Sequence, residues 1–316
     1  MHNPIAPLLE KNTALLLDGG IGTGLFARGL QSGDSPETWN LIKPEKIYDL
    51  HKEFIDAGSD VILTNSFGAN RARLALHNAQ DHVAQLCAAS VAIAKDATRA
   101  ASRTVLVAGS IGPSGEILEP HGSFGYADAV AVFRQQAQAL AEAGADLLWV
   151  ETMSSKEEIL AACTACADVG MPYCATMTFD TVGYTMMGVS PADAYRYISD
   201  LDPVPLAMGA NCGLGMSENA VSILQINKIL RDGLLIIAKA NYGIPSFRDG
   251  AFHYSGTPKT MAQYCEFVLR LGARLIGGCC GTTGETLRSM RAVIDNFQGG
   301  LPPTRDEIVA TLGEPF

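Results

Sequence analysis

The stretch from Ala127 to Thr152 reads ADAVAVFRQQAQALAEAGADLLWVET and contains the unit from which the fold is predicted. Its first part, Ala127–Ala143, has apolar residues at helical spacing, and Gly144 follows as a left-handed helix stop. Its second part, Asp146–Thr152, is an apolar run without polar alternation. Such a run is typical of a parallel strand that is buried on both faces. The stretch therefore predicts a helix packed against a parallel strand.

Similar units recur along the chain. The predicted strands are Ala14–Gly20, Asp60–Phe67, Thr104–Gly112, Asp146–Thr152, Pro172–Phe179, Leu206–Cys212, Leu234–Asn241 and Ala273–Cys280. The predicted helices are Pro44–Ala57, Ala69–Ala101, Ala127–Ala143, Lys156–Val169, Pro191–Asp200, Ser217–Asp232, Pro258–Leu271 and Glu285–Phe297. This alternation predicts an α/β protein, a single (β/α)8 TIM barrel over residues 1–298 with a Pro/Gly-rich tail over 299–316. An open, doubly wound sheet is the alternative.

Composition excludes several classes of protein. The formal net charge of −10 disfavours nucleic acid or an anionic membrane as a partner, because both attract Lys and Arg. No apolar run approaches the roughly 20 residues of a membrane-spanning helix. Met1–Asn12 lacks the pattern of a signal peptide. Eight cysteines without a signal peptide indicate a reducing, cytoplasmic setting, where metal binding or buried thiols are expected before disulfides.

Three cysteines are expected at one end of the barrel, where the carboxyl ends of the strands carry the chemistry of such folds. Cys212 ends a predicted strand in an Asn-Cys-Gly turn, and Cys279 and Cys280 stand in the glycine frame GGCCG. The glycines permit the backbone angles that aim neighbouring sulfurs at one point. Three thiolates with a free fourth position are typical of a catalytic zinc ion. The alternative is a set of inert, buried thiols.

The remaining cysteines have weaker signals. Cys163 and Cys166 form a CxxC pair inside an apolar helix, which favours packing over a thiol-redox site with a lowered pKa. Cys87, Cys174 and Cys265 lie in apolar contexts and are predicted to be core residues.

Two carboxylates, Asp18 and Glu151, follow apolar strands and would lie at the same barrel mouth. We expect them to hold a cation such as an α-amino group, with a structural role as the alternative. The glycine-rich segment GGIGTG at residues 19–24 lacks the P-loop and dinucleotide signatures, so we expect a turn packed closely against a ligand or the metal.

A zinc ion with three thiolate ligands is a poor activator of water, but it keeps a further thiol deprotonated at neutral pH. Such a thiolate attacks electrophilic carbon, for example a methyl group on a sulfonium or a quaternary nitrogen. These residues therefore predict alkyl transfer to a thiol. A non-catalytic zinc barrel is the alternative from another functional class.

The sequence resembles the zinc-dependent homocysteine S-methyltransferase family, which includes betaine–homocysteine methyltransferase and the homocysteine-binding module of cobalamin-dependent methionine synthase. The resemblance runs from about Leu15 to Ile294. It rests on DGGIGT at 18–23, AGSD at 57–60, TNSF at 64–67, GSIGP at 109–113, ET at 151–152, GANCG at 209–213 and GGCCGTT at 277–283.

The resemblance implies a TIM barrel that transfers a methyl group to the zinc-bound thiolate of homocysteine and gives methionine. The implied Zn²⁺ ligands are Cys212, Cys279 and Cys280, and the implied homocysteine contacts are Asp18, Gly19, Ser66, Phe67, Gly109, Ser110, Glu151 and Asn211. A homo-oligomer is a further expectation.

Glycine betaine is the preferred donor, and its quaternary ammonium calls for an aromatic cage. The residues proposed for this cage are Phe67, Trp39, Phe124, Tyr184, Tyr242 and Tyr254. However, the stretch around Trp39 is closer to the methionine synthase module, and Thr152 replaces a tyrosine of the betaine enzymes. S-methylmethionine and a partner corrinoid protein are therefore alternative methyl sources.

Overall fold

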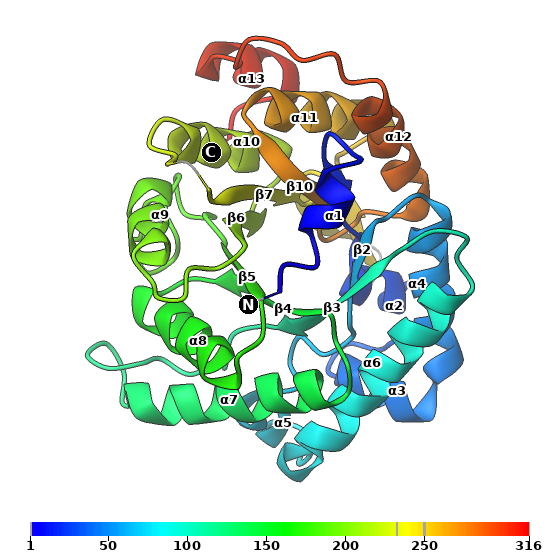
Figure 1. The fold of residues 1–316 in the computed structure, drawn as a ribbon, viewed down its shortest axis with the longest axis vertical. Helices are drawn as coiled ribbons and strands as arrows, with labels where there is room; N and C mark the ends of the chain where they lie inside the picture. The colour runs from blue at the N-terminus through cyan, green and yellow to red at the C-terminus, as the bar shows by residue number, and fades with distance from the viewer. Residues whose placement is uncertain (1, 232, 249–250, 316) are drawn as a thin grey trace.

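The computed structural model describes residues 2–231, 233–248 and 251–315. Eight parallel strands form one sheet that curls into a barrel, with helices around its outside (Figure 1). The sheet order is β1-β10-β7-β6-β5-β4-β3-β2. Its strands are β1 (Leu15–Leu16), β2 (Val61–Leu63), β3 (Leu106–Ile111), β4 (Leu147–Met153), β5 (Tyr173–Met177), β6 (Ala207–Cys212), β7 (Leu235–Ala240) and β10 (Ala273–Gly278). The predicted TIM barrel is confirmed, and the open doubly wound sheet is wrong.

The seam between β1 and β2 is closed partly by side chains. The backbone N–H of Asp60 donates to the Leu16 carbonyl at 2.6 Å, and the Asp60 carboxylate accepts from Leu16 N at 2.9 Å. The Asp18 carboxylate accepts from Leu63 N at 2.8 Å. Carboxylates thus supply hydrogen bonds where the short strand β1 cannot.

The principal helices follow the strands as predicted. They are α4 (Pro44–Asp56), α6 (Val83–Arg99), α7 (Tyr126–Glu142), α8 (Lys156–Val169), α9 (Pro191–Ser199), α10 (Met216–Asn227), α11 (Pro258–Arg270) and α12 (Gly284–Asp295). Shorter helices are α1 (Ala6–Leu9), α2 (Ile21–Phe26), α3 (Trp39–Ile42) and α5 (Arg71–Ala75), with 3-10 turns η1 (Pro36–Thr38) and η2 (Gln80–His82). None of the described helices has the length and apolar character needed to cross a membrane.

Four sequence expectations need correction. The single helix expected over 69–101 is divided into α5, η2 and α6, because Asn78 has a left-handed φ of 55° that no helix continues through. The helix expected over 217–232 ends at Asn227, and Asp232 lies outside the described residues. The glycine-rich segment at 19–24 begins helix α2 rather than forming only a turn. A hairpin of β8 (Pro245–Arg248) and β9 (Ala251–Tyr254) was not predicted.

The tail contains a helix of its own, α13 (Arg305–Leu312), which packs against α10 and α11 at the top of Figure 1. Thr304 caps α13 through a reciprocal hydrogen-bond pair with Glu307. Arg270 of α11 pairs with Glu307 at 3.0 Å, and Ser217 of α10 donates to the Gly313 carbonyl at 2.5 Å. These contacts fix the tail to the outer face of the barrel.

Candidate metal and substrate site

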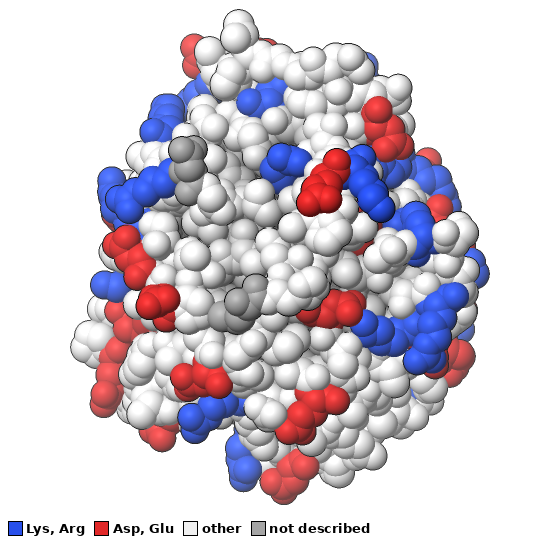
Figure 2. Space-filling view, viewed as in Figure 1, with Lys and Arg blue, Asp and Glu red and all other residues white. Residues whose placement is uncertain are grey.

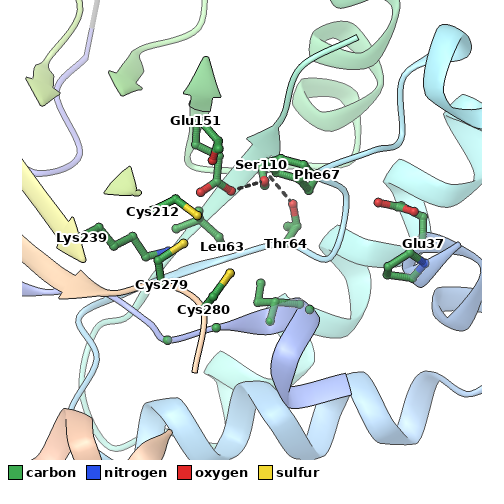
Figure 3. Close-up of a pocket in the computed structure, with 16 residues that line it drawn as sticks. Glu37, Leu63, Thr64, Phe67, Ser110, Glu151, Cys212, Lys239, Cys279 and Cys280 are labelled. Carbon is green, nitrogen blue, oxygen red and sulfur yellow. Dashed lines mark hydrogen bonds between the residues drawn. The ribbon is translucent and has the colours of Figure 1, made fainter. Parts of the chain in front are cut away.

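Three cysteine sulfurs converge at the carboxyl ends of the strands. Cys212 ends β6, and Cys279 and Cys280 follow β10 directly. Their sulfur atoms all lie within 4.8 Å of one another, and Figure 3 shows the three side chains directed toward one point. The cluster found in the structure is the one predicted from the sequence.

The backbone around the cysteines makes this convergence possible. Cys212 has a left-handed φ of 61°, and Gly281 turns the chain after Cys280 with a φ of 80°. Gly20 lies so close to this loop that a Cβ on it would be 2.7 Å from the Cys279 carbonyl oxygen. The expected close packing of the glycine-rich segment is therefore packing against the cysteine loop.

Two asparagines hold the cysteine loops in place. The Asn241 side chain donates to the Gly213 carbonyl at 2.5 Å and accepts from Cys280 N at 3.0 Å, so it joins the two loops. Asn211 braces β4 from behind the cluster, because its amide oxygen accepts from Thr152 N at 2.8 Å. Its amide nitrogen lies 4.0 Å from the Cys279 sulfur.

The cysteines open onto a cavity of about 230 Å³. This volume suits small metabolites rather than a large cofactor. Its walls contain the three cysteines together with Gly19, Gly20, Ile21, Gly22, Pro36, Glu37, Leu63, Thr64, Phe67, Ser110, Glu151, Thr152 and Lys239. Among the expected homocysteine contacts, Gly19, Phe67, Ser110 and Glu151 thus line the cavity.

The other expected contacts lie behind this wall. Ser66 is buried and bonds to Thr64 Oγ1 at 2.6 Å and to the Ser110 carbonyl at 2.8 Å. Gly109 packs against Leu140, and Asn211 acts through Thr152 as described. Asp18 is fully buried and does not line the cavity.

Asp18 is paired with a residue that the sequence prediction missed. Lys239 of β7 lines the cavity and donates from Nζ to Asp18 Oδ1 at 2.7 Å, with both side chains buried. Burial by itself would lower the pKa of the Lys239 ammonium, but the charges of Asp18, Glu151 and Cys279 outweigh it and raise that pKa. Lys239 therefore stays positively charged. A lone lysine in the apolar run LLIIAKAN was the available sequence signal.

Glu151 faces the cavity without an ion-pair partner. Its Oε1 accepts from Ser110 Oγ at 2.6 Å, and none of the described lysine or arginine nitrogens lies within 4.0 Å of it. Burial raises the pKa of Glu151, partly opposed by the charge of Lys239. A cationic group entering the cavity would keep this carboxylate ionised.

The aromatic residues proposed for the donor site were expected to surround the cavity, but most of them do not line it. Phe67 lines the cavity, whereas Trp39, Phe124, Tyr184, Tyr242 and Tyr254 do not. Trp39 is buried in the outer core with Lys43 4.3 Å from its ring centroid, and Tyr184 is half exposed. Tyr254 and Tyr242 lie beside the cysteine loop: the Tyr254 ring would lie 2.6 Å from a Cβ on Gly281, and Tyr242 N donates to the Cys280 carbonyl at 2.9 Å.

The CxxC cysteines have the packing role predicted for them. Cys163 and Cys166 are fully buried within α8, and burial raises the pKa of both thiols. The redox alternative required a lowered pKa, and burial acts in the opposite direction on both thiols. Cys87, Cys174 and Cys265 are also buried, as expected.

On the face shown in Figure 2, acidic and basic side chains are interspersed, without a continuous basic area. This face offers none of the concentrated positive charge with which proteins attract nucleic acid.

Comparison with known proteins gives matches over most of the chain. The sequence profile of the homocysteine S-methyltransferase family matches residues 15–294. The homocysteine S-methyltransferase of Escherichia coli (strain K12) is 29% identical, over 92% of this chain and 98% of that protein. The methionine synthase of Mycobacterium tuberculosis is 28% identical over 89% of this chain and 24% of that protein. The chain therefore spans about a quarter of the length of that methionine synthase.

Among solved structures, the metallated form of the homocysteine methyltransferase MmuM from Escherichia coli superposes with a TM-score of 0.77. It is 28% identical to this chain, and the match covers 92% of this chain and 99% of that one.

Proposed function

The chain belongs to the homocysteine S-methyltransferase family, and on that premise we propose that it methylates the thiol of homocysteine, using a small onium compound as donor and giving methionine. The observation that carries the proposal is the convergence of three cysteine sulfurs beside a cavity whose wall also presents an unpaired carboxylate. The sulfurs suit a metal that binds a thiol, and the carboxylate suits the amino group of the same substrate.

The donor set fits a zinc ion. Zn–S bonds of about 2.3 Å in a tetrahedron place sulfurs about 3.8 Å apart, which agrees with sulfurs that all lie within 4.8 Å of one another. Cys212, Cys279 and Cys280 would hold the ion and leave one position toward the cavity. When bound, zinc keeps a thiol substrate ionised at neutral pH, which makes its sulfur a nucleophile.

The residues around the cavity bind and orient the amino acid. Glu151 accepts the homocysteine ammonium, and Ser110 Oγ fixes the direction of that carboxylate. The Asp18–Lys239 pair forms the buried floor beside it, so Asp18 acts through Lys239 rather than directly on the substrate. Ser66, Gly109 and Asn211 shape the wall from behind.

The methyl transfer is a displacement at carbon. The homocysteine sulfur forms a bond to the methyl carbon while the bond from that carbon to the onium nitrogen or sulfur breaks, and the electron pair leaves with the amine or thioether. The negative charge of the thiolate and the positive charge of the donor disappear together. A cavity shielded from water favours this step, because charge neutralisation is easier in a medium of low dielectric constant.

Glycine betaine is the preferred donor, with Phe67 as the aromatic surface available to its methyl groups. S-methylmethionine is the second candidate, because its sulfonium belongs to the same class of small onium donors. A partner corrinoid protein is the third, because the chain also matches one quarter of a methionine synthase.

The test is methionine formation by the reduced, zinc-loaded protein from homocysteine and glycine betaine, with S-methylmethionine in a parallel reaction. Turnover with betaine supports the proposal in full. Turnover with S-methylmethionine alone keeps the reaction and replaces the donor. Turnover that appears only when a methylated corrinoid protein is added overturns the onium donor. Failure of homocysteine to add a sulfur neighbour to zinc in X-ray absorption would overturn the proposal itself.

A further inference from the structure

A second carboxylate lies on the cavity wall and has no part in holding homocysteine. Glu37 belongs to the 3-10 turn η1 and lines the cavity, although the residue is only 5% exposed. In Figure 3 it lies at the end away from the three sulfurs, beyond Thr64 and Phe67. The cavity therefore has one buried carboxylate, Glu151, near the sulfurs and another at its far end.

The partners of Glu37 are all uncharged. Its Oε1 accepts from the backbone N–H of Gly68 at 2.7 Å, and its Oε2 accepts from Ser35 Oγ at 2.7 Å. No lysine or arginine nitrogen in the described part of the chain lies within 4.0 Å of this carboxylate. Burying a charge without a counter-charge is costly, so a cation from outside the chain is the partner that would stabilise it.

The charges around the cavity leave two places for cations. Lys239 is the one basic residue among the described residues that line it, and its charge is matched by Asp18. Glu151 and Glu37 therefore remain unpaired. The ammonium of homocysteine can satisfy Glu151 only, because Glu37 lies at the opposite end of the cavity. The second cation must arrive with the other substrate.

We propose that Glu37 binds the positive charge of the methyl donor and restricts the cavity to cationic donors. The inference rests on the methyl transfer proposed above and names the residue that selects the donor. Phe67 lies between Glu37 and the sulfurs, so an onium group can contact the ring face while the carboxylate supplies the charge.

The direction of the charge change determines how Glu37 acts. The donor is fully cationic when it binds and loses its charge as the methyl group leaves. A carboxylate therefore stabilises the bound donor more than the transition state, and it contributes to KM rather than to kcat. This makes Glu37 a specificity residue and not an accelerator of the reaction.

The test compares E37Q with the wild-type protein, using betaine as substrate and 3,3-dimethylbutyrate as a competitive inhibitor. This inhibitor has the shape of betaine with an uncharged carbon in place of the nitrogen. We expect E37Q to raise the KM for betaine about tenfold, while the inhibition constant of 3,3-dimethylbutyrate, the zinc content and the KM for homocysteine stay within twofold. The same comparison with S-methylmethionine distinguishes a sulfonium from a quaternary ammonium donor.

S35A is the matched control, because it removes the hydrogen bond to Glu37 Oε2 and keeps the charge. It should leave the KM for the donor within about threefold. An unchanged donor KM in E37Q, or an equal loss of betaine and 3,3-dimethylbutyrate binding, would overturn the role of Glu37. A wild-type protein that uses neither onium donor would instead overturn the donor class itself, so the two failures are distinguishable.

Discussion

Asp60 and Glu151 lie at opposite ends of the barrel strands, and they differ in their surroundings. Asp60, before β2, is paired with Arg291 at 2.9 Å and with Arg103 at 3.3 Å. Asp146, before β4, is paired with Lys95 at 2.7 Å in the same way. Glu151, at the end of β4, has only the Ser110 hydroxyl and an open cavity. Asp60 and Asp146 find their cations within the chain and stabilise the fold, whereas Glu151 faces the cavity unpaired and is available to a ligand.

The sulfur atoms show the same contrast. Cys163 and Cys166 are fully buried in an apolar helix interface, where nothing requires them to ionise. Cys212, Cys279 and Cys280 are gathered at the cavity by left-handed backbone and by asparagine hydrogen bonds. This positioning supports the proposed metal site at Cys212, Cys279 and Cys280, while the burial of Cys163 and Cys166 supports a packing role.

The largest expected effect is on zinc content and turnover, and it distinguishes the clustered Cys212, Cys279 and Cys280 from the buried pair Cys163 and Cys166. Cys280→Ser should lose most of the bound zinc and reduce methyl transfer at least about a thousandfold, because a hydroxyl is a poor zinc ligand. Cys163→Ser should retain zinc and activity. Metal analysis and turnover of both variants, with circular dichroism as a check of folding, provide the measurement. Zinc lost from the Cys163 variant and kept by the Cys280 variant would refute the assignment.

His51 extends the comparison between paired and unpaired buried groups, because it has no partner and faces no cavity. His51 in α4 is fully buried, neither ring nitrogen has a hydrogen-bond partner, and burial lowers its pKa from 6.5 to about 4. It is neutral in the fold above that value, whereas the unfolded chain takes up a proton below pH 6.5. The contribution of His51 to the free energy of unfolding should therefore be fully present above pH 6.5. It should be lower by about 2.5 kcal/mol near pH 4.5.

The pH dependence is measured by urea unfolding across this range. His51→Phe should flatten the dependence, and His82→Asn, at an exposed position, should keep it. Equal slopes in all three proteins would show that His51 is not responsible.

At the amino ends of the strands, where the carboxylates have ion-pair partners, Asp60→Asn should lower the free energy of unfolding by about 2 kcal/mol. The change removes the carboxylate that Arg103 and Arg291 share. Arg291 keeps its pair with Asp295 at 2.7 Å, and the partial exposure of both arginines keeps the cost below that of a fully buried pair. The folded variant should retain its kcat and KM within twofold, because Asp60 precedes β2 at the amino end of the strand and does not line the cavity. Loss of activity with unchanged stability would contradict the assigned role.

At the carboxyl ends of the strands, where Glu151 has no ion-pair partner, Glu151→Gln should weaken substrate binding without lowering the stability of the fold. Its KM for homocysteine should rise about tenfold, the value expected for one lost charge-assisted hydrogen bond. Its unfolding free energy should remain equal or increase slightly, because an uncompensated buried charge is removed. Steady-state kinetics and urea unfolding of the same preparation test both parts. A variant that is destabilised but binds homocysteine normally would make Glu151 a structural residue.

The sequence by itself determined the barrel and the sulfur cluster. Apolar runs, helical spacing and glycine stops are local signals, and each follows from the burial and hydrogen bonding of a single strand or helix. Cys212, Cys279 and Cys280 were identifiable because parallel strands in a barrel bring their carboxyl ends together. The same reasoning placed Glu151 at the barrel mouth, and the family resemblance implied Ser110 as its neighbour; both line the cavity.

Only the tertiary structure decided which charges are paired. Lys239 meets Asp18 across 221 positions of sequence, and Glu37 reaches the cavity from a short turn without any periodic pattern. Local sequence patterns also did not predict the break at Asn78, the hairpin of β8 and β9, or the docking of α13. Whether a buried carboxylate meets a cation depends on barrel closure and on the neighbouring loops, which no local stretch of sequence specifies.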